Sequence, residues 1–495
     1  MKRILLNIAF LLLAGLLFQS FQPTEKGHDI EINIKGLTSD YVILAYYYAD
    51  KPYIKDTIFT KTPGTYRYKG EETLKGGMYM IVIPPKNNSF DLMVDADDQH
   101  FKVTTELGNI QGKMEYKNSK NNSLFQGYVA YLNQQKASSD KKVDELKKEK
   151  AKTEGKDEAK IKELEEVLKN VNNDVIAYQK DFISKHSTTF VAKFIKTSMD
   201  LDVPEPPKNA DGKVDSTFRY RYYVEHYFEH CDLSDGRLLQ TPLLPKKVDR
   251  YLDKVIPQHP DSVAFHVDRV LSLASNDKDM FKYFVIKLLN TYAKTKVVCM
   301  DAVYVHIADN YYLNGKVDWL DDKQLTGIKD DADRLRPLLC NKIAPDITLQ
   351  TFPKKEGDKP IPMSLHGIDA KYTVLIFWAP DCGHCKKTMP LVAKFYDEYK
   401  SKGVEVYSVC TKTYKDYDSC VEFIKEKDMD RMLNLTDPYL RSRFPVIYDV
   451  KSTPVVFVLD QKKKIVSKRI GGEQLGEVLD NLFKREDFIK KQEGK

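Results

Sequence analysis

A pair of cysteines lies in Trp378-Ala-Pro-Asp-Cys382-Gly-His-Cys385, between two segments with different secondary-structure patterns. The preceding segment, 372–378, is continuously apolar, β-branched and aromatic, which predicts a strand buried on both faces of a sheet. The following segment, 386–396, carries apolar residues at roughly helical spacing. The sequence therefore predicts a strand, a short turn and a helix, with the Cys-x-x-Cys motif at the start of the helix.

This position has a chemical consequence for the two thiols. The first turn of a helix has unpaired backbone N–H groups, which stabilise an anion such as a thiolate. We therefore expect Cys382 to be exposed and to have a lowered pKa, and Cys385 to be shielded until it resolves a mixed disulfide. A protonated His384 between them should favour the thiolate further.

Zinc binding and a purely structural disulfide are the other uses of such a pair. Zinc needs about four ligands, and neither a second Cys-x-x-Cys nor a His-x-x-x-His follows at the spacing of a zinc finger;. A structural disulfide would close so short a loop that it would remove little chain entropy. We therefore expect a redox-active dithiol that needs no metal and no cofactor.

Composition and charge limit the class of protein. With 495 residues and 42% hydrophobic content, the chain is long enough for several domains with cores of their own;. Its 78 basic and 72 acidic residues leave a net charge of only +6. This balance argues against a dedicated nucleic-acid-binding protein.

The amino terminus, residues 1–22, has the pattern of a secretory signal peptide. Lys2 and Arg3 precede an apolar run that ends at Phe18, and a loose cleavage zone follows;. No cysteine stands just after the run, so the sequence does not support a bacterial lipoprotein anchor. The run is short for a membrane span, and an uncleaved anchor is the alternative. We expect an exported protein with no stable membrane span after signal cleavage.

The rest of the chain divides into four parts, which predict a multidomain protein. Residues 28–120 alternate like strands between turn clusters, as in a small antiparallel sandwich or partial barrel. Residues 121–186 are charge-rich and predict a solvent-facing helical hairpin. Residues 187–340 predict an α-helical domain. Residues 341–490 predict an α/β domain with the order ββαβαββα, which is thioredoxin topology with an added amino-terminal hairpin.

A second motif supports this topology. Thr453 and Pro454 immediately precede the predicted strand 455–459. In the thioredoxin fold a proline at this point is cis and packs beside the dithiol, so that the backbone of the preceding residue can pair with an incoming extended peptide. We therefore expect Thr453 and Pro454 to lie next to Cys382.

The sequence resembles the TlpA/ResA-like branch of the thioredoxin superfamily. Two stretches carry this resemblance, Phe377-Trp-Ala-Pro-Asp-Cys-Gly-His-Cys-Lys-Lys-Thr-Met-Pro390 and Thr453-Pro-Val-Val-Phe-Val-Leu-Asp460. The resemblance covers residues 341–490 and implies that Cys382 attacks and Cys385 resolves. Redox tuning or contact with the substrate backbone is assigned to Trp378, Gly383, His384, Thr453 and Pro454. The Gly-His spacer suggests a more oxidising dithiol than that of a thioredoxin.

The sequence also departs from the family. Thr388 stands where many relatives have an acidic residue, and Ile376 stands where thioredoxin has a buried acid. The usual proton acceptor for the resolving thiol is therefore absent, and water, His384 or a distant carboxylate must replace it. Asp381 replaces a common tryptophan and places a negative charge that opposes the thiolate. The signature of peroxiredoxins, the nearest rival with this fold, is missing.

The remaining cysteines have simpler expected roles. Cys231, Cys299 and Cys340 are scattered, and we expect free buried thiols. Cys410 and Cys420 would form either a second disulfide or accessory relay, or two unrelated thiols. We favour two unrelated thiols because Cys410 ends a buried strand.

His226 and His230 lie four residues apart, beside Cys231, and could form a metal patch on one helix face. The sequence indicates no further ligand, so we favour an aromatic packing helix with polar histidine tips.

The resemblance implies a periplasmic protein of a Gram-negative bacterium, in which a β-rich and a helical domain precede the thioredoxin module. We expect a thiol-disulfide oxidoreductase that reduces, oxidises or exchanges disulfides in envelope proteins. Its partners would be thiol- or disulfide-containing envelope proteins and a membrane or periplasmic redox partner. The alternative is a non-catalytic envelope binding or assembly protein that uses the thioredoxin fold as a scaffold.

Overall fold

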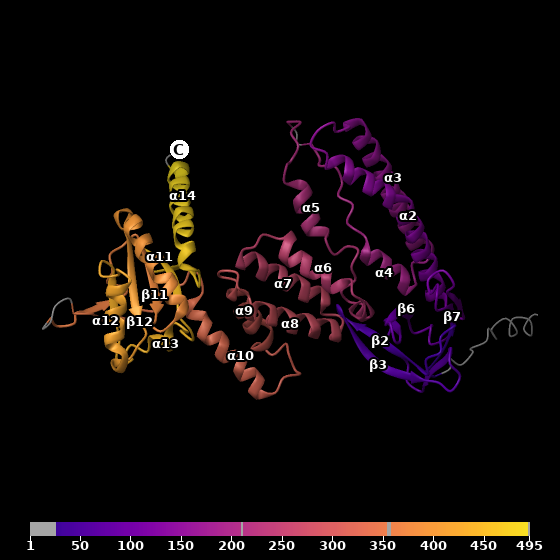
Figure 1. Cartoon of the computed structure of the whole chain (residues 1–495), viewed down its shortest axis with the longest axis horizontal. Coiled ribbons are helices and arrows are strands. Elements are labelled where there is room, and N and C mark those ends of the chain that lie inside the picture. Colours follow the sequence, from indigo (N-terminus) through magenta and orange to yellow (C-terminus); the bar gives the residue numbers. More distant parts are fainter. Residues whose placement is uncertain (1–25, 209–210, 354–357, 494–495) are drawn as a thin grey trace, which may run out of the picture. The chain divides into compact units, whose positions relative to one another are not determined.

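The computed structural model of the chain describes residues 26–208, 211–353 and 358–493 (Figure 1). The expected signal peptide, residues 1–22, lies outside the described residues. The chain forms two compact units, one of residues up to 255 with 273–280, and one of residues 256–272 with 281 onward. The fold class is confirmed: β sheets come first, then a helical region, then an α/β domain with a thioredoxin-like fold.

The first unit begins with two four-stranded sheets, in the orders β4-β1-β7-β8 and β3-β2-β5-β6. Inward-facing side chains such as Ile30, Ile32 and Ile34 alternate with half-buried ones along β1 and form part of a common core;. All strand pairs are antiparallel except β1 and β7, which are parallel. The strands are β1 (His28–Lys35), β2 (Tyr41–Tyr48), β3 (Lys51–Phe59), β4 (Thr65–Gly70), β5 (Gly77–Ile83), β6 (Asn88–Val94), β7 (His100–Glu106) and β8 (Glu115–Lys117).

A long hairpin of two helices follows, α2 (Lys120–Lys150) and α3 (Glu158–Lys185). The side chains of Ser119 and Asp157 accept hydrogen bonds from backbone N–H groups of the first turns and so begin the two helices;. The rings of Tyr131 and Tyr178 stack across the hairpin at 3.9 Å between centroids.

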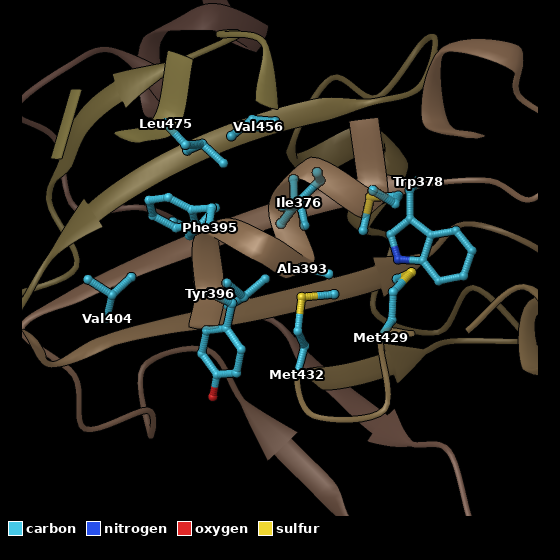
Figure 2. Packing of buried hydrophobic residues seen from close by; sticks show 14 of the residues in the cluster. Ile376, Trp378, Ala393, Phe395, Tyr396, Val404, Met429, Met432, Val456 and Leu475 are labelled. Atoms are coloured by element: carbon cyan, nitrogen blue, oxygen red, sulfur yellow. The ribbon is translucent and has the colours of Figure 1, made fainter. Parts of the chain in front are cut away.

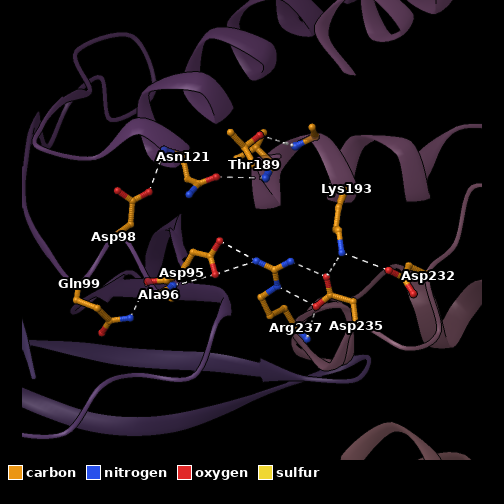
Figure 3. A network of polar contacts seen from close by, with 12 residues as sticks. Asp95, Ala96, Asp98, Gln99, Asn121, Thr189, Lys193, Asp232, Asp235 and Arg237 are labelled. Atoms are coloured by element: carbon orange, nitrogen blue, oxygen red, sulfur yellow. Dashed lines mark hydrogen bonds and ion pairs between the residues drawn. The ribbon is translucent and has the colours of Figure 1, made fainter. Parts of the chain in front are cut away.

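Arg237 lies at the centre of a polar network in this unit (Figure 3). Its guanidinium donates to Asp95, which follows β6, at 2.8 and 2.9 Å, and to Asp235 at 2.6 Å. Lys193 of α4 (Phe190–Ser198) forms an ion pair with the same Asp235 at 2.7 Å. The network therefore connects the end of a strand to the helical segments that follow.

The helical region continues across the middle of the chain. His226, at the end of α5, stacks on Tyr222 and pairs with Glu229 at 3.2 Å. Among the described residues no group of three or more His, Cys, Asp or Glu side chains is placed to hold a metal ion. The further helices are α5 (Phe218–His226), α6 (Leu244–Arg250), α7 (Pro260–Ala274), α8 (Lys278–Ala293), α9 (Asp301–Ile307) and α10 (Asp322–Leu335).

Two of the expected free thiols form a disulfide instead. Cys299 and Cys340 are bonded, with their Cα atoms 5.6 Å apart, so the expectation of free thiols was wrong for this pair. The physical reason is that the chain after α10 returns to the segment that precedes α9. Cys231 is free and buried, as expected.

The second unit ends in a seven-stranded sheet of order β10-β9-β13-β12-β11-β14-β15. β11 lies at its centre, parallel to β12 and antiparallel to β14, and all of its residues are buried. The strands are β9 (Thr348–Thr351), β10 (Pro362–Ser364), β11 (Tyr372–Trp378), β12 (Val404–Cys410), β13 (Leu433–Thr436), β14 (Val455–Asp460) and β15 (Ile465–Lys468). The helices are α11 (Gly383–Tyr399), α12 (Tyr417–Glu426), α13 (Phe444–Ile447) and α14 (Leu475–Glu493).

Each face of this sheet has its own apolar core, because successive side chains of β11 point to opposite faces. Ile376 and Trp378 pack on one face with side chains of α11, such as Phe395 (Figure 2). Leu375 and Phe377 pack on the other face. The continuous apolar run of β11 thus reflects burial on both sides.

The expected element order was incomplete. It lacked β13 and α13, which lie between α12 and β14, and it had two strands before the first helix, where the structure has three, β9, β10 and β11. β13 has only four residues and is a strand because it pairs with β12, with Cys410 opposite Thr436. No helix in the part of the chain described by the structure is long and apolar enough to cross a membrane.

Candidate active site

The cysteine pair lies where β11 ends and α11 begins. Cys382 is the residue that caps α11, with extended backbone angles, and its sulfur accepts a hydrogen bond from the Cys385 backbone N–H at 3.3 Å. The structure contains both residues as free thiols. The N–H groups of the first turn therefore face the sulfur of Cys382, where they stabilise a thiolate.

The two sulfurs differ in exposure and in acidity. Cys385 is fully buried, and this burial raises its pKa to about 12. Cys382 is partly exposed, and its burial also raises the pKa. Hydrogen bonds from the Thr453 side chain, from Cys385 and from the His384 backbone outweigh this effect, so that the pKa of Cys382 is lowered;. Of the two sulfurs, Cys382 is therefore the one that ionises more readily and that a substrate can reach;.

Thr453 and Pro454 lie directly beside this sulfur. The Thr453–Pro454 peptide bond is cis, and the Cys382 thiol donates to the Thr453 carbonyl oxygen at 3.1 Å. β14 begins immediately afterwards and pairs with β11. The structure thus brings together two motifs that are about seventy residues apart in the sequence.

Trp378 supports the site from within the core. It is fully buried, its ring stacks on Phe423 at 4.9 Å, and its indole N–H donates to the Ser408 hydroxyl at 2.8 Å. Its side chain is therefore part of the core in Figure 2 and is not a surface that a substrate can touch. Gly383 and His384 are exposed on the first turn of α11.

Neither of the two positions discussed above for the proton acceptor of the resolving thiol carries an acidic side chain. Ile376 is fully buried and apolar, and Thr388 is half-buried. The polar side chain that hydrogen-bonds both sulfurs is Thr453, and this contact lowers the pKa of Cys385 against the larger effect of burial. In the sequence, the position of Thr453 directly before Pro454 indicated that Thr453 lies next to the cysteine pair.

Sequence reasoning missed the partner of Asp381. The Lys412 ammonium lies 2.6 Å from its carboxylate and holds the pKa of Asp381 below its usual value. The negative charge that was expected to oppose the Cys382 thiolate is therefore paired. Lys412 follows β12, whose end lies beside the end of the parallel strand β11, so the topology places it there.

The cysteines of β12 and α12 are the second correction. Cys410 and Cys420 form a disulfide with their Cα atoms 6.4 Å apart, whereas two unrelated thiols were favoured. Both are almost fully buried, because α12 covers the face of the sheet to which Cys410 points. A substrate has no access to this disulfide.

Comparisons with known proteins match two parts of the chain. The sequence profile of the AhpC/TSA family matches residues 340–468, and that of a domain of unknown function, DUF5106, matches residues 179–336. The chain is 30% identical over 133 residues to the thiol-disulfide oxidoreductase ResA of a Bacillus cereus strain, which is 26% of this chain and 70% of ResA.

A second curated relative is the thioredoxin-like protein YneN of Bacillus subtilis (strain 168), 31% identical over 130 residues, covering 26% of this chain and 69% of YneN. Among solved structures, a domain of a possible thiol-disulfide isomerase from Cytophaga hutchinsonii is 32% identical. It covers 31% of this chain and 98% of that domain, with a TM-score of 0.27. The detected similarity to these relatives is therefore limited to about a third of the chain or less.

Proposed function

Since this chain belongs to the ResA-like thiol-disulfide oxidoreductases of the thioredoxin superfamily, we propose that Cys382 and Cys385 exchange disulfides with exported proteins. The observation that carries the proposal is the difference between the two sulfurs. Cys382 is partly exposed with a lowered pKa, and Cys385 is buried with a pKa raised to about 12. Cys382 is thus the thiol that attacks the substrate, and Cys385 reacts only afterwards, with the mixed disulfide.

In the first step the Cys382 thiolate attacks one sulfur of a substrate disulfide. A bond forms between that sulfur and Cys382 Sγ, the substrate S–S bond breaks, and the second substrate sulfur leaves as a thiolate that takes a proton from water. The Thr453 carbonyl, next to Cys382 Sγ, is placed to accept a backbone N–H of a substrate segment that lies in extended form;.

In the second step Cys385 gives up its proton and attacks Cys382 Sγ. A bond forms between Cys382 and Cys385, and the bond to the substrate breaks, so that the remaining substrate sulfur also leaves as a thiol. The substrate disulfide gains two electrons, and the dithiol loses two. The high pKa of Cys385 keeps it from competing with Cys382 for substrates before this step;.

A second partner must return the pair to its starting state. A dithiol partner that reduces the Cys382–Cys385 disulfide makes the protein a reductase. Substrate thiols that deliver electrons to the same disulfide make it an oxidase. Release of Cys382 from the mixed disulfide by a second substrate thiol, with no net electron transfer, makes it an isomerase. We assign this partner to the membrane or periplasm, and the protein to the periplasm of a Gram-negative bacterium, on the signal pattern of residues 1–22;.

The parts of the chain that precede the dithiol domain supply partner recognition in this proposal. We assign that role to the β domain, 28–120, the helical hairpin, 121–186, and the helical domain, 187–340, with the chemistry in residues 341–490. The dithiol domain is the smaller part of the chain. The residues before it offer a large surface on which a partner protein could be recognised.

A turnover assay with the full chain tests the proposed function. We expect the wild-type protein to accelerate reduction of insulin disulfides by dithiothreitol, and Cys382→Ala to reduce this acceleration to background. Cys231→Ala is the matched control, because Cys231 is a free, buried thiol in the other unit. Equal activity in the Cys382→Ala variant would contradict the proposal and favour a scaffold role.

A further inference from the structure

Two exposed tyrosines form a surface near the reactive cysteine. The side chains of Tyr414 and Tyr439 are exposed by 59% and 66%, and their rings stack at 5.9 Å with an interplanar angle of 21°. Leu440, next to Tyr439, is exposed by 38%. We call these three residues the tyrosine platform. Large apolar side chains that lie together in solvent commonly mark a binding surface.

The topology places the tyrosine platform at the same edge of the sheet as Cys382. β11, β12 and β13 are parallel, with Trp378 opposite Cys410 and Cys410 opposite Thr436. The carboxyl ends of the three strands therefore coincide. The dithiol follows β11, Tyr414 lies four residues after β12, and Tyr439 lies three residues after β13.

Hydrogen bonds and an ion pair join these loops to the active-site turn and to each other. The Thr411 N–H donates to the Trp378 carbonyl oxygen at 2.9 Å, and Lys412 pairs with Asp381, the residue before Cys382, at 2.6 Å. The Tyr414 N–H donates to the Pro438 carbonyl oxygen at 3.1 Å. The platform thus begins two residues beyond a side chain that is fixed to the dithiol turn.

The loop that carries Tyr439 is preorganised by a buried carboxylate. Asp437 accepts hydrogen bonds from the Arg441 N–H at 3.1 Å and from the Ser442 N–H and hydroxyl at 2.7 Å each. A binding surface that is already ordered loses little entropy when a ligand docks. Both tyrosines are therefore held in position before a substrate arrives.

The charges around the platform are mostly positive. Arg441 lies over the Tyr439 ring at 5.2 Å, and Lys415 and Arg443 are exposed on the same two loops, where the exposed acid is Asp416. Asp381, the acidic residue beside the dithiol, is already paired with Lys412. A basic border of this kind favours an acidic partner by electrostatic complementarity.

We propose that the tyrosine platform binds the segment of a substrate protein that flanks the attacked cysteine, and that it selects aromatic or branched apolar side chains next to acidic residues. This inference rests on the proposed function. The Thr453 carbonyl binds substrate backbone of any sequence, whereas the platform contacts the side chains on the other side of the cysteine. The ligand of the tyrosine platform is therefore an extended segment of a disulfide-bearing protein that contains acidic and apolar residues.

Peptide disulfides and a small disulfide separate this role from the dithiol chemistry. The first probe is a mixed disulfide of an acidic peptide that has Phe next to its cysteine. The second is the same peptide disulfide with Ser in place of Phe and Lys in place of the acidic residues. The third is the small disulfide 2,2′-dithiodipyridine. For the wild-type full chain we expect faster reduction of the acidic Phe peptide at low salt. The preference should shrink as added salt screens the charges.

In single-turnover measurements with the pre-reduced protein as the only reductant, the variant Tyr414→Ala/Tyr439→Ala should lower the second-order rate constant for the acidic Phe peptide roughly tenfold, chiefly by raising the peptide concentration that gives half of the maximal rate. Reduction of dithiodipyridine should be unchanged. Phe488→Ala is the matched control, because Phe488 is exposed by 63% on α14, and it should leave all three rates unchanged.

Equal reduction of both peptides by the wild-type protein would overturn the proposal, and so would the absence of a selective loss for the acidic Phe peptide in the double variant. A parallel loss with dithiodipyridine would also overturn it, because the tyrosines would then act on the dithiol itself. A wild-type protein that reduces none of the three disulfides would instead contradict the proposed function, and with it this proposal.

Discussion

The sulfur of Cys382 lies 3.1 Å from the carbonyl oxygen of Thr453, the residue before Pro454. This contact joins the start of α11 to the start of β14. α11 follows the central strand β11 in the chain, and β14 pairs with β11. A substrate that reaches the sulfur therefore meets the Thr453 backbone at the same time. In the proposed mechanism, the Cys382 sulfur reacts while the neighbouring Thr453 carbonyl holds the extended chain.

The difference in acidity between the two cysteines predicts selective alkylation. In the reduced full chain we expect iodoacetamide to react rapidly with one thiol, Cys382, with a pH midpoint below that of an ordinary cysteine, because its pKa is lowered;. Cys385 should stay unmodified up to high pH, since burial raises its pKa to about 12. Mass spectrometry of the modified peptide identifies the site. Rapid alkylation of Cys385 would contradict the assignment.

Lys412 should assist the thiolate by pairing with Asp381. Lys412→Gln leaves the Asp381 charge unpaired near Cys382, so we expect a higher pKa of Cys382 and an alkylation rate at pH 7 lowered by roughly twofold, a small effect because the pair is exposed;. Adding Asp381→Asn to this variant should restore the rate. If the double variant stays as slow as the single one, Lys412 acts by some other route.

The Thr453 side chain should tune both sulfurs. Thr453→Val replaces the hydroxyl with a methyl group of nearly the same size, and so removes hydrogen bonds that lower the pKa of Cys382 and of Cys385. We expect the pH midpoint of Cys382 alkylation to move upward, and Thr453→Ser to restore it. An unchanged midpoint in Thr453→Val would show that the carbonyl contact alone matters.

The Cys410–Cys420 disulfide should contribute to stability and not to turnover. Cys410→Ala/Cys420→Ala removes a crosslink between residues ten apart in sequence, so the free energy of unfolding in urea should fall by about 2–4 kcal/mol. Insulin reduction per folded molecule should be unchanged, because both sulfurs are buried. Lost turnover with unchanged stability would instead identify an accessory redox relay.

The elements around the dithiol could be predicted because their signals are local. The apolar run 372–378 is buried on both faces of the sheet, and helical spacing after Cys385 reflects one buried face of α11. β13 could not be predicted in this way. Its four residues form a strand only through pairing with β12, and that pairing depends on the whole fold;.

The missed contacts are those that join distant segments. Cys299 and Cys340 are 41 residues apart, and their bond depends on how the chain returns after α10. Lys412 and Asp381 meet because two parallel strands end side by side. Neither pair has a spacing that marks it in a single sequence, whereas Thr453 could be identified because it precedes a proline at the start of a strand.

Covalent trapping tests the central claim most directly. Cys385→Ser removes the resolving thiol and should accumulate mixed disulfides between Cys382 and proteins of an oxidised periplasmic extract, visible as reducible high-mass bands and absent from Cys382→Ser/Cys385→Ser. Wild-type protein should accumulate few of them, because Cys385 resolves each adduct. If Cys385→Ser captures no more protein than the double variant, Cys382 is not an attacking thiol and the proposed mechanism is wrong.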